Sequence, residues 1–263
     1  MTTVKPFFIK VITPLHAGSG SDVGVVDMPI QRESHTSFPK IEASSLKGSI
    51  RSEFTDKHNE EDAKKIFGTG DNAGALGFSD ARILFFPVKS VKGVFAYVTC
   101  PMVLERLQED LKLSSDKTFS ISKISLNDDE KCIVFSDKNS IKDNVVLEEY
   151  SFAIQETKTE DFIKLSNFDE VKERLVIISD NNFTHFVKNS TEVITRIRIG
   201  DDGVVDKKSG ALFTEEYLPT ETVMYALALG EVEHIKDLNV LQVGGNSTLG
   251  KGIVELKGLS NGK

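Results

Sequence analysis

HAGSGSDVGVVDMPIQRESHTSFPKIEASSLKGSIR, residues 16–51, joins an expected strand that ends at Leu15 to an expected helix that begins near Ser44. A loop of this length inside a compact domain is uncommon unless it is functional or disordered. Its apolar residues favour burial and argue against a linker: Val25, Val26, Met28, Ile30, Phe38 and Ile41. We therefore interpret residues 16–51 as a working loop that carries His16 and the carboxylate of Asp27.

The overall composition is that of a soluble globular protein. The 263 residues suffice for one large domain or two small ones, with a sizeable core in either case. No apolar run reaches the length of a membrane span, and the N-terminal MTTVKPFFIK lacks a signal-peptide pattern. Cys100 and Cys132 lie in expected strands, so neither a disulfide scaffold nor a cysteine metal site is expected. Together these features favour a cytoplasmic protein that binds no membrane.

The charge balance argues against a nucleic-acid partner, because phosphates attract cations and the formal net charge is -8. The charge is unevenly distributed, however. Residues 1–57 contain seven Lys/Arg and six Asp/Glu, a balance of +1, so the remaining residues carry -9. Because a net total says little about a local groove, the N-terminal part of the chain can still meet an anion.

The first half of the chain predicts the order strand, helix, strand, strand, helix. Ser44 or Ser45 is the expected N-cap of the first long helix. Hydrophobic spacing gives strands at 4–13, 78–88 and 94–100, and helices at 44–57, 58–67 and 102–113. If Lys131–Phe135 or a later apolar run supplies the last strand, the order is that of a βαββαβ ferredoxin-like fold. We therefore expect an α+β fold.

The second half is less regular. Residues of about 114–146 are charged and indicate an insertion. The pattern beyond them predicts a strand at 147–154, a helix at 161–178, β-structure at 183–200 with a turn near Asn189, strand character at 212–229 and a last strand at 253–256. Arg196 and Arg198 are two residues apart, so on a strand they would point to the same side.

The C-terminal GNSTLGKG, residues 245–252, is close to the phosphate-binding P-loop pattern. Gly252 stands where that pattern needs a hydroxyl residue, and an expected strand follows where it needs a helix. The remaining interpretations are a glycine-rich turn, or a loop whose backbone N–H groups meet phosphates without nucleotide hydrolysis.

Other residues permit more than one reading. His16 and Asp27 suit acid–base chemistry, although a lone Asp in a loop is more often a turn or cap residue and a lone His more often structural. Lys47 and Arg51 share one face near a helix N-terminus, which suits either an anion site or a solvated basic face. No Ser/His/Asp order, HExxH or CxxC motif is present.

Three segments carry a family resemblance: HAGSG at 16–20, GVVDMPIQRE at 24–33 and FPKIEASSLKGSIR at 38–51. With GGNSTLGKG at 244–252, they resemble the RAMP superfamily of CRISPR proteins. More narrowly, they resemble the repeated backbone subunit of the type III-B (Cmr) RNA-targeting complex. The motifs cover both ends of the chain, and the middle resembles the family only in layout.

This resemblance implies a single RAMP domain over 1–263 with a modified RRM or ferredoxin-like palm. It implies a β-hairpin thumb within about 183–211 and stacking of copies into a helical filament on the guide RNA (crRNA). It further implies cleavage of target RNA beside each thumb, dependent on a divalent metal, for which Mg²⁺ is expected. The family's essential aspartate falls on Asp27 and its loop histidine on His16, and its acidic–aromatic pair is matched more loosely by Glu215 and Tyr217.

RNA supplies its own nucleophile, the 2′-OH, so the protein has only to orient a splayed nucleotide and handle a proton. A lone Asp binds Mg²⁺ weakly, so a metal site at Asp27 would be complete only with RNA bound. The residues expected to contact RNA are Ser44, Ser45, Lys47, Arg51, Arg196, Arg198, Gly244, Gly245, Gly250, Lys251 and Gly252. Such contacts read the RNA backbone rather than the bases.

Two other functions remain open beside the endoribonuclease. The first is a non-catalytic RNA-binding scaffold of the same complex, in which Asp27 only shapes its loop. The second is a guide-processing nuclease of the same superfamily. For a backbone subunit, the resemblance implies partners in a large polymerase-like subunit, a small helical subunit and further RAMP subunits.

Overall fold

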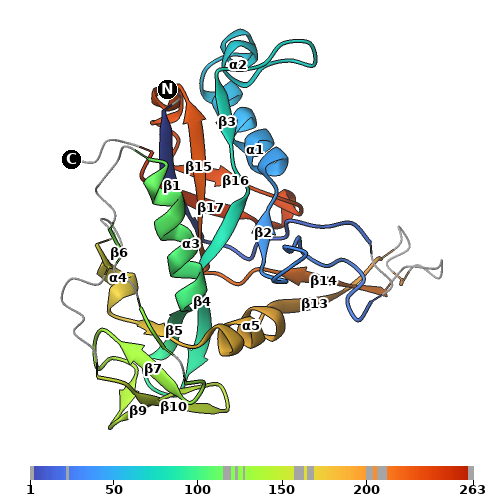
Figure 1. The fold of residues 1–263 in the computed structure, drawn as a ribbon. Helices are drawn as coiled ribbons and strands as arrows, with labels where there is room; N and C mark the ends of the chain where they lie inside the picture. The colour runs from blue at the N-terminus through green and yellow to red at the C-terminus, as the bar shows by residue number, and fades with distance from the viewer. Residues whose placement is uncertain are drawn as a thin grey trace.

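The computed structural model describes residues 3–21, 24–114, 120–121, 124–126, 128–156, 163–164, 169–199, 204–205 and 212–259. The fold is α+β, as expected (Figure 1). The helices are α1 (Ala43–Lys57), α2 (Glu60–Phe67), α3 (Pro101–Lys112), α4 (Asp169–Lys172) and α5 (Asp180–Asn189), with 3-10 turns η1 (Val232–Ile235) and η2 (Ser247–Leu249). None of the helices in these ranges is both long and apolar enough to cross a membrane.

The strands form one large sheet and two short pairs. They are β1 (Val4–Val11), β2 (Lys40–Ile41), β3 (Leu76–Phe78), β4 (Ala81–Ser90), β5 (Val94–Thr99), β6 (Ser120–Ile121), β7 (Lys131–Val134), β8 (Ser140–Ile141), β9 (Asn144–Leu147), β10 (Tyr150–Ile154), β11 (Ile163–Lys164), β12 (Leu175–Ile177), β13 (Glu192–Ile197), β14 (Leu212–Tyr217), β15 (Val223–Gly230), β16 (Val240–Gln242) and β17 (Ile253–Lys257). Among the described strands, β13 pairs with β14 alone, and together they form an antiparallel hairpin set apart from the large sheet.

The palm is built around β15, which lies between β1 and β4. β15 reads VMYALALG and its first six residues are buried, as expected for a strand covered on both faces. On its other side β1 pairs with β17, so the two ends of the chain meet in one sheet. α3 packs against β4 and α1 against β3. The strand that completes the palm therefore comes from late in the chain, not from Lys131–Phe135.

The segment expected as an insertion contributes strands to the large sheet. Pairings run in a ring through β4, β5, β12, β7, β10 and β9. The ring closes where Ser90 of β4 pairs with Leu147 of β9, and the Glu148 N–H donates to the Lys89 carbonyl at 2.9 Å. Val145, Leu147 and Phe152 are buried inside it. Together with β4, β5 and β12, residues 131–154 thus form a small closed lobe at one end of the molecule, seen below β4 in Figure 1.

The interpretation of 183–200 as β-structure was wrong for its first half. Asp180–Asn189 is helix α5, and the hairpin strand begins only at Glu192. The Ser179 side chain caps the helix by accepting from the Asn182 N–H, one of the first-turn N–H groups that have no partner within the helix. Phe183, Phe186 and Val187 are buried, at the spacing of one helix face.

The expected helix over 161–178 was also wrong for most of the residues that the structure describes. Only Asp169–Lys172 is helical, while Leu175–Ile177 is β12. Residues 161–162 and 165–168 of that expectation lie outside the described residues. The expected strand over 147–154 is two strands, β9 and β10, which turn at Glu148, where φ is +50°.

The start of α1 differs in detail from the expectation. Its N-cap is Glu42, so Ser44 and Ser45 lie within the first turn and do not cap the helix. The Asp80 carboxylate takes over part of the capping role by accepting from the Ala43 N–H at 2.8 Å. The helices expected at 58–67 and 102–113 and the strand at 253–256 are confirmed.

Candidate functional site

The long loop before α1 is folded against β14. Short bridges join Leu15 to Leu218, Gly18 to Ile30, and Met28 to Glu215, the last in parallel orientation. Ile30, Phe38 and Ile41 are buried as expected, whereas Val25 is fully exposed, against expectation. The described parts of the loop, residues 16–21 and 24–42, are therefore held in place by these bridges, and Val25 and Asp27 face solvent.

Asp27 is exposed, and Thr214 of β14 holds its carboxylate. Oδ2 accepts from the Thr214 N–H and from the Thr214 hydroxyl, both at 2.8 Å. The Asp27 N–H donates to the same hydroxyl at 3.0 Å. The backbone and hydroxyl hydrogen bonds from Thr214 lower the pKa of Asp27, so the group is a carboxylate at neutral pH. In the described part of the chain, no residue hydrogen-bonds to Oδ1.

His16 is buried and reaches the same strand two residues further along. Its Nδ1 lies 2.7 Å from the carbonyl oxygen of Glu216. A carbonyl can only accept, so Nδ1 carries the hydrogen and, in the neutral ring, Nε2 keeps its lone pair. Thr214 and Glu216 are about 7 Å apart along an extended strand. β14 therefore holds Asp27 and His16 in fixed relation to each other.

Glycines make room for His16. A Cβ on Gly18 would lie 2.6 Å from His16 Nε2, and one on Gly244 would overlap the His16 carbonyl oxygen. The Gly245 N–H donates to that carbonyl at 2.9 Å. The loop that begins at Gly244 is thus packed directly on the histidine, and it continues through η2 into β17, not into a helix. This arrangement excludes a P-loop, as expected.

Gly244→Ala is expected to lower the free energy of unfolding by at least about 2 kcal/mol, because it adds a backbone overlap to the strain of a positive φ. Gly250→Ala is the matched control. Gly250 has a similar φ of +69° but nothing within 4 Å of its added Cβ, so only the left-handed strain of about 1–2 kcal/mol applies. Urea denaturation of both variants checks this, and equal losses would contradict the packing described for Gly244.

Behind His16 lies a buried ionic cluster centred on Glu215 and Tyr217. Glu215 Oε2 accepts from Arg196 Nε at 2.6 Å and from the Tyr217 hydroxyl at 2.7 Å. Asn246 donates to the Tyr217 oxygen at 3.0 Å and to Glu215 Oε1 at 3.2 Å. The His16 and Tyr217 rings are in contact, with centroids 5.5 Å apart. The cluster therefore joins the hairpin, the glycine-rich loop and the N-terminal loop.

Burial and pairing set the pKa values of this cluster. Burial of Glu215 opposes its ionisation, but hydrogen bonds from Tyr217 and Asn246 and the charge of Arg196 outweigh it and lower the pKa of Glu215. Burial, together with the hydrogen bond to Glu215, raises the pKa of Tyr217 to about 12. Tyr217 has no exposed surface, and Lys251 Nζ lies 5.2 Å from its ring centroid. The side chains of Glu215 and Tyr217 are therefore buried behind His16, where they hold the surrounding segments in place.

A second ion pair fixes the other side of the loop. Arg32 pairs with the buried carboxylate of Glu216 and also donates to the Val187 carbonyl at 3.0 Å. Glu216 accepts from the Ile30 N–H at 3.1 Å. These partners lie far from residues 16–51 in the chain, and sequence reasoning did not identify Arg32, Glu216, Thr214 or Asn246.

The start of α1 forms a separate surface. Ser44 is exposed, and Ser45 and Lys47 are partly exposed. Arg51 pairs with Glu60 at 3.0 Å and donates to the Gly68 carbonyl, so its guanidinium is directed toward α2. Gly48 has nothing within 4 Å of an added Cβ, and it lines a hollow of about 340 Å³ together with Gln242. α1 and β16 both line this hollow, and β16 leads into the glycine-rich loop.

The structure thus divides the expected site residues into groups. It brings His16, Arg196, Glu215, Tyr217, Gly244, Gly245 and Lys251 together around β14. Asp27 is held by Thr214, two residues before the His16 contact on the same strand. Gly250 and Gly252 lie in the turn after η2, and Arg198 is exposed beyond the end of β13. The predicted thumb limits of 183–211 remain a prediction, while the hairpin strands themselves span Glu192–Ile197 and Leu212–Tyr217.

The residues near Asp27 do not make a metal site by themselves. Among the described residues, no group of three or more His, Cys, Asp or Glu side chains could hold a metal ion. Glu215 and Glu216 are buried and paired with arginines, and His16 faces Gly18. Asp27 can offer one carboxylate oxygen. A single oxygen falls short of the ligand set that Mg²⁺ or Ca²⁺ requires.

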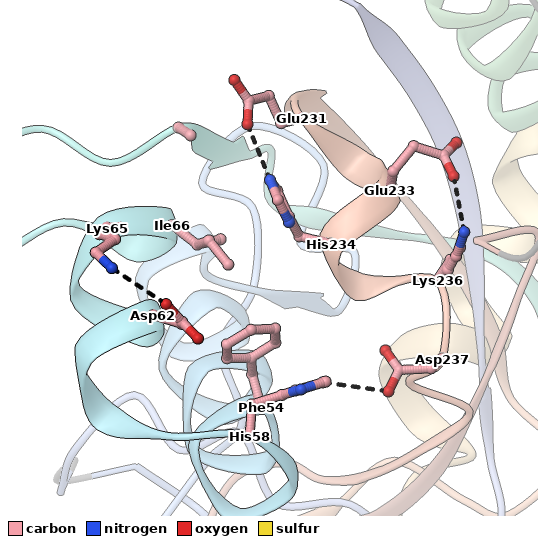
Figure 2. A pocket seen from close by; sticks show the side chains of 11 residues that line it. Phe54, His58, Asp62, Lys65, Ile66, Glu231, Glu233, His234, Lys236 and Asp237 are labelled. Atoms are coloured by element: carbon pink, nitrogen blue, oxygen red, sulfur yellow. Dashed lines mark hydrogen bonds and ion pairs between the residues drawn. The ribbon is translucent and has the colours of Figure 1, made fainter.

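A groove of about 690 Å³ lies elsewhere, between the α1–α2 helices and η1. Figure 2 shows His58 directed toward Asp237 and His234 toward Glu231, over an apolar floor that includes Phe54 and Ile66. Four carboxylates and two lysines line the groove. That excess of negative charge disfavours the binding of RNA phosphates in the groove.

Comparison with known proteins matches residues 8–255 to the RAMP superfamily. The CRISPR system Cmr endoribonuclease Cmr4 of Pyrococcus furiosus is 40% identical over 94% of this chain and 93% of its own length. A crystal structure of oligomeric Cmr4 from the same organism superposes with a TM-score of 0.77 at 34% identity, covering 97% of each chain. A chain in a cryo-EM structure of type III-B Cmr-beta bound to cognate target RNA gives a TM-score of 0.78 at 28% identity, covering 96% of each chain. The chain therefore belongs to the RAMP superfamily.

Proposed function

We propose that this chain is the guide-RNA-binding backbone subunit of a type III-B CRISPR effector complex and that it cuts complementary target RNA. The observation that carries the proposal is the exposed Asp27 carboxylate, held by Thr214 in the middle of the β13–β14 hairpin ladder. The full-length similarity to a Cmr endoribonuclease supports the same function. Copies of the chain stack along one guide RNA, with the hairpin as the thumb.

The reaction uses the nucleophile that RNA carries. The target 2′-OH gives its proton to solvent and attacks the neighbouring phosphorus, which forms a 2′,3′-cyclic phosphate. The P–O5′ bond to the next nucleotide breaks, and its 5′-oxygen takes up a proton from solvent. The low pKa of Asp27 keeps it ionised at neutral pH, so Oδ1 can accept a hydrogen bond from the 2′-OH or ligate a cation. The same low pKa makes Asp27 a weak general base, which favours orientation and electrostatic stabilisation as its main contribution.

His16, Glu215 and Tyr217 act in this proposal by shaping the site. His16 is buried between Gly18 and Gly245 and binds β14 through Nδ1. Glu215 and Tyr217 have at most 3% of their surface exposed, which leaves them no direct access to RNA. They hold Arg196 and Asn246, and through them the glycine-rich loop.

The guide RNA is bound by the α1 start and the glycine-rich loop. Ser44, Ser45 and Lys47 offer a hydroxyl and ammonium surface beside the first N–H groups of α1. Gln242 lines the same hollow as Gly48 and connects this surface to the loop. Because these groups bind phosphates and not bases, the subunit accepts any guide sequence. Other Cmr subunits and further copies of this chain complete the assembly, which we expect in the cytoplasm.

We propose that a divalent metal, Mg²⁺, joins the site only when RNA supplies phosphate ligands, and that it then stabilises negative charge on the phosphate. Without RNA, the chain is expected to bind Mn²⁺ no more tightly than about millimolar, because Asp27 alone offers one oxygen. Addition of guide and uncleavable target should create a tighter site. Mn²⁺ titration followed by electron paramagnetic resonance measures both states, and equal binding with and without RNA would contradict the proposal.

Reconstitution of the complex with guide RNA tests the function. The assembled chain is expected to form elongated particles, bind complementary target and cut it at regular intervals. Incubation of the isolated chain with precursor repeat RNA separates the guide-processing alternative, because a backbone subunit should leave that RNA whole. A particle that remains monomeric on guide RNA would contradict the filament.

One observation favours the scaffold alternative. Asp27 makes three hydrogen bonds with Thr214, which is also how a purely structural turn aspartate would behave. A scaffold would keep target binding and need another subunit for the cut. The two functions diverge in the effect of replacing Asp27, which is described in the Discussion.

A further inference from the structure

Thr214 and Asp27 are joined by three hydrogen bonds. Its N–H and its hydroxyl both bond to Oδ2, and its hydroxyl oxygen also accepts from the Asp27 N–H. The residues are 187 positions apart in the chain. Such a closed arrangement fixes both the side chain and the backbone of Asp27, because it restrains the residue at two points.

The direction of each hydrogen bond follows from chemistry. An ionised carboxylate has no hydrogen to donate, so the hydroxyl must direct its only hydrogen to Oδ2. Its lone pair then receives the Asp27 N–H. Both donors converge on Oδ2, and Oδ1 is left free of bonds to the described residues. Because Asp27 is exposed, the oxygen that the threonine leaves unbound is the one available to a ligand.

Neighbouring backbone bonds hold this contact in place. The Met28 N–H donates to the Thr214 carbonyl, and the Glu216 N–H donates to the Met28 carbonyl, each at 3.0 Å. Thr214 is also in the hairpin ladder, opposite Thr195 of β13. A shift of the hairpin would therefore displace Asp27 as well.

We propose that Thr214 is a positioning residue for the cleavage step. Its hydroxyl and N–H hold Asp27 so that Oδ1 faces the target RNA, and they couple the position of Oδ1 to the position of the β13–β14 hairpin. This inference rests on the proposed function. A carboxylate misplaced by about 1 Å can cost about a hundredfold in rate, so the loss of the hydroxyl should be visible in cleavage.

Thr214→Val removes the hydroxyl and keeps the branched shape and the N–H. In the guide-assembled complex with saturating target, the single-turnover cleavage rate is expected to fall about 10- to 100-fold, with target affinity unchanged. Thr214→Ala removes the same hydroxyl without crowding and should show the same loss if the valine variant fails to assemble. Thr214→Ser restores the hydroxyl and should cut within about threefold of the original chain.

Thr184→Val is the matched control. Thr184 lies in α5, and its hydroxyl donates to the Asp180 carbonyl at 2.7 Å, away from Asp27. This variant loses the same group and should cut at the original rate. Equal slowing by Thr184→Val and Thr214→Val would overturn the proposal, as would full-rate cleavage by both Thr214→Val and Thr214→Ala.

A double variant separates positioning from general damage. In an Asp27→Asn background, Thr214→Val should slow cleavage no further, because the hydroxyl acts through Asp27. A further loss would assign Thr214 a merely structural role. Failure of the proposed function has a different signature: the original complex leaves target whole, or Asp27→Asn cuts normally. If the original complex cuts, Asp27→Asn does not and Thr214→Val does at full rate, only the positioning inference fails.

Discussion

Asp27→Asn is expected to slow target-RNA cleavage by the guide-assembled complex about 10²- to 10⁴-fold while target binding is retained. The Thr214 N–H and hydroxyl both donate to Oδ2, so the amide oxygen of an asparagine will settle in that position. Its NH₂ group then points outward where Oδ1 was. The outward atom changes from an acceptor to a donor, and it can neither accept from a 2′-OH nor ligate a cation.

The measurement is single-turnover cleavage of a complementary target by complexes of equal composition, with filter binding for affinity. Asp71→Asn is the control, because Asp71 is an exposed aspartate in the turn after α2 and should leave the rate unchanged. Cleavage by Asp27→Asn at the original rate would refute the endoribonuclease and leave the scaffold alternative. A loss of target binding with the loss of cleavage would instead make Asp27 an RNA-binding residue.

Arg196→Met is expected to lower the free energy of unfolding by about 3–5 kcal/mol. Glu215 keeps only 5% of its side chain exposed and loses its arginine partner, so among the described residues a buried carboxylate is left with the hydrogen bonds from Tyr217 and Asn246. Because folded domains are stable by only about 5–15 kcal/mol, the change is large. Urea denaturation measures it, and Glu215→Gln in the same chain should recover part of the loss by removing the uncompensated charge.

Arg51→Met provides the comparison. The Arg51–Glu60 pair leaves 34% and 53% of its side chains exposed, and breaking it should cost no more than about 1 kcal/mol. The buried pair also makes stability depend on pH. Since folding lowers the pKa of Glu215, its contribution is complete above its unfolded pKa of about 4.3 and is lost as the pH falls through the folded pKa. Stability that stayed constant on acidification, or equal costs for the two arginines, would contradict the burial of this pair.

The α+β class and several elements could be predicted from local patterns, and the errors have local causes too. α3 was found because its apolar residues recur at helical spacing in a long segment. α5 was taken for a strand, although Ser179 is a good N-cap and Phe183, Phe186 and Val187 lie at helical spacing. β12 is only three residues long, and so short an apolar run does not distinguish strand from helix.

The sequence predicted several residues of the site, but not the residues with which they form hydrogen bonds and ion pairs. Asp27 and His16 were singled out from the loop and from the family motifs, yet their partners on β14 are about 190 to 200 positions away in the chain. Pairing of Arg196 with Glu215 follows from the hairpin register, which a connection as long as residues 198–211 does not specify. Asn246 did carry a signal, since asparagine tolerates the left-handed φ of +64° that the glycine-rich loop needs.

The closed ring of β4, β5, β12, β7, β10 and β9 has a consequence for solubility. An open strand edge is a template on which another chain can add a strand, and many copies held side by side on one RNA would raise that hazard. Closure of the ring leaves the small lobe only the two-residue β8 as an edge among the described strands. When neighbouring copies crowd against it, the lobe therefore offers few unpaired strand edges to them.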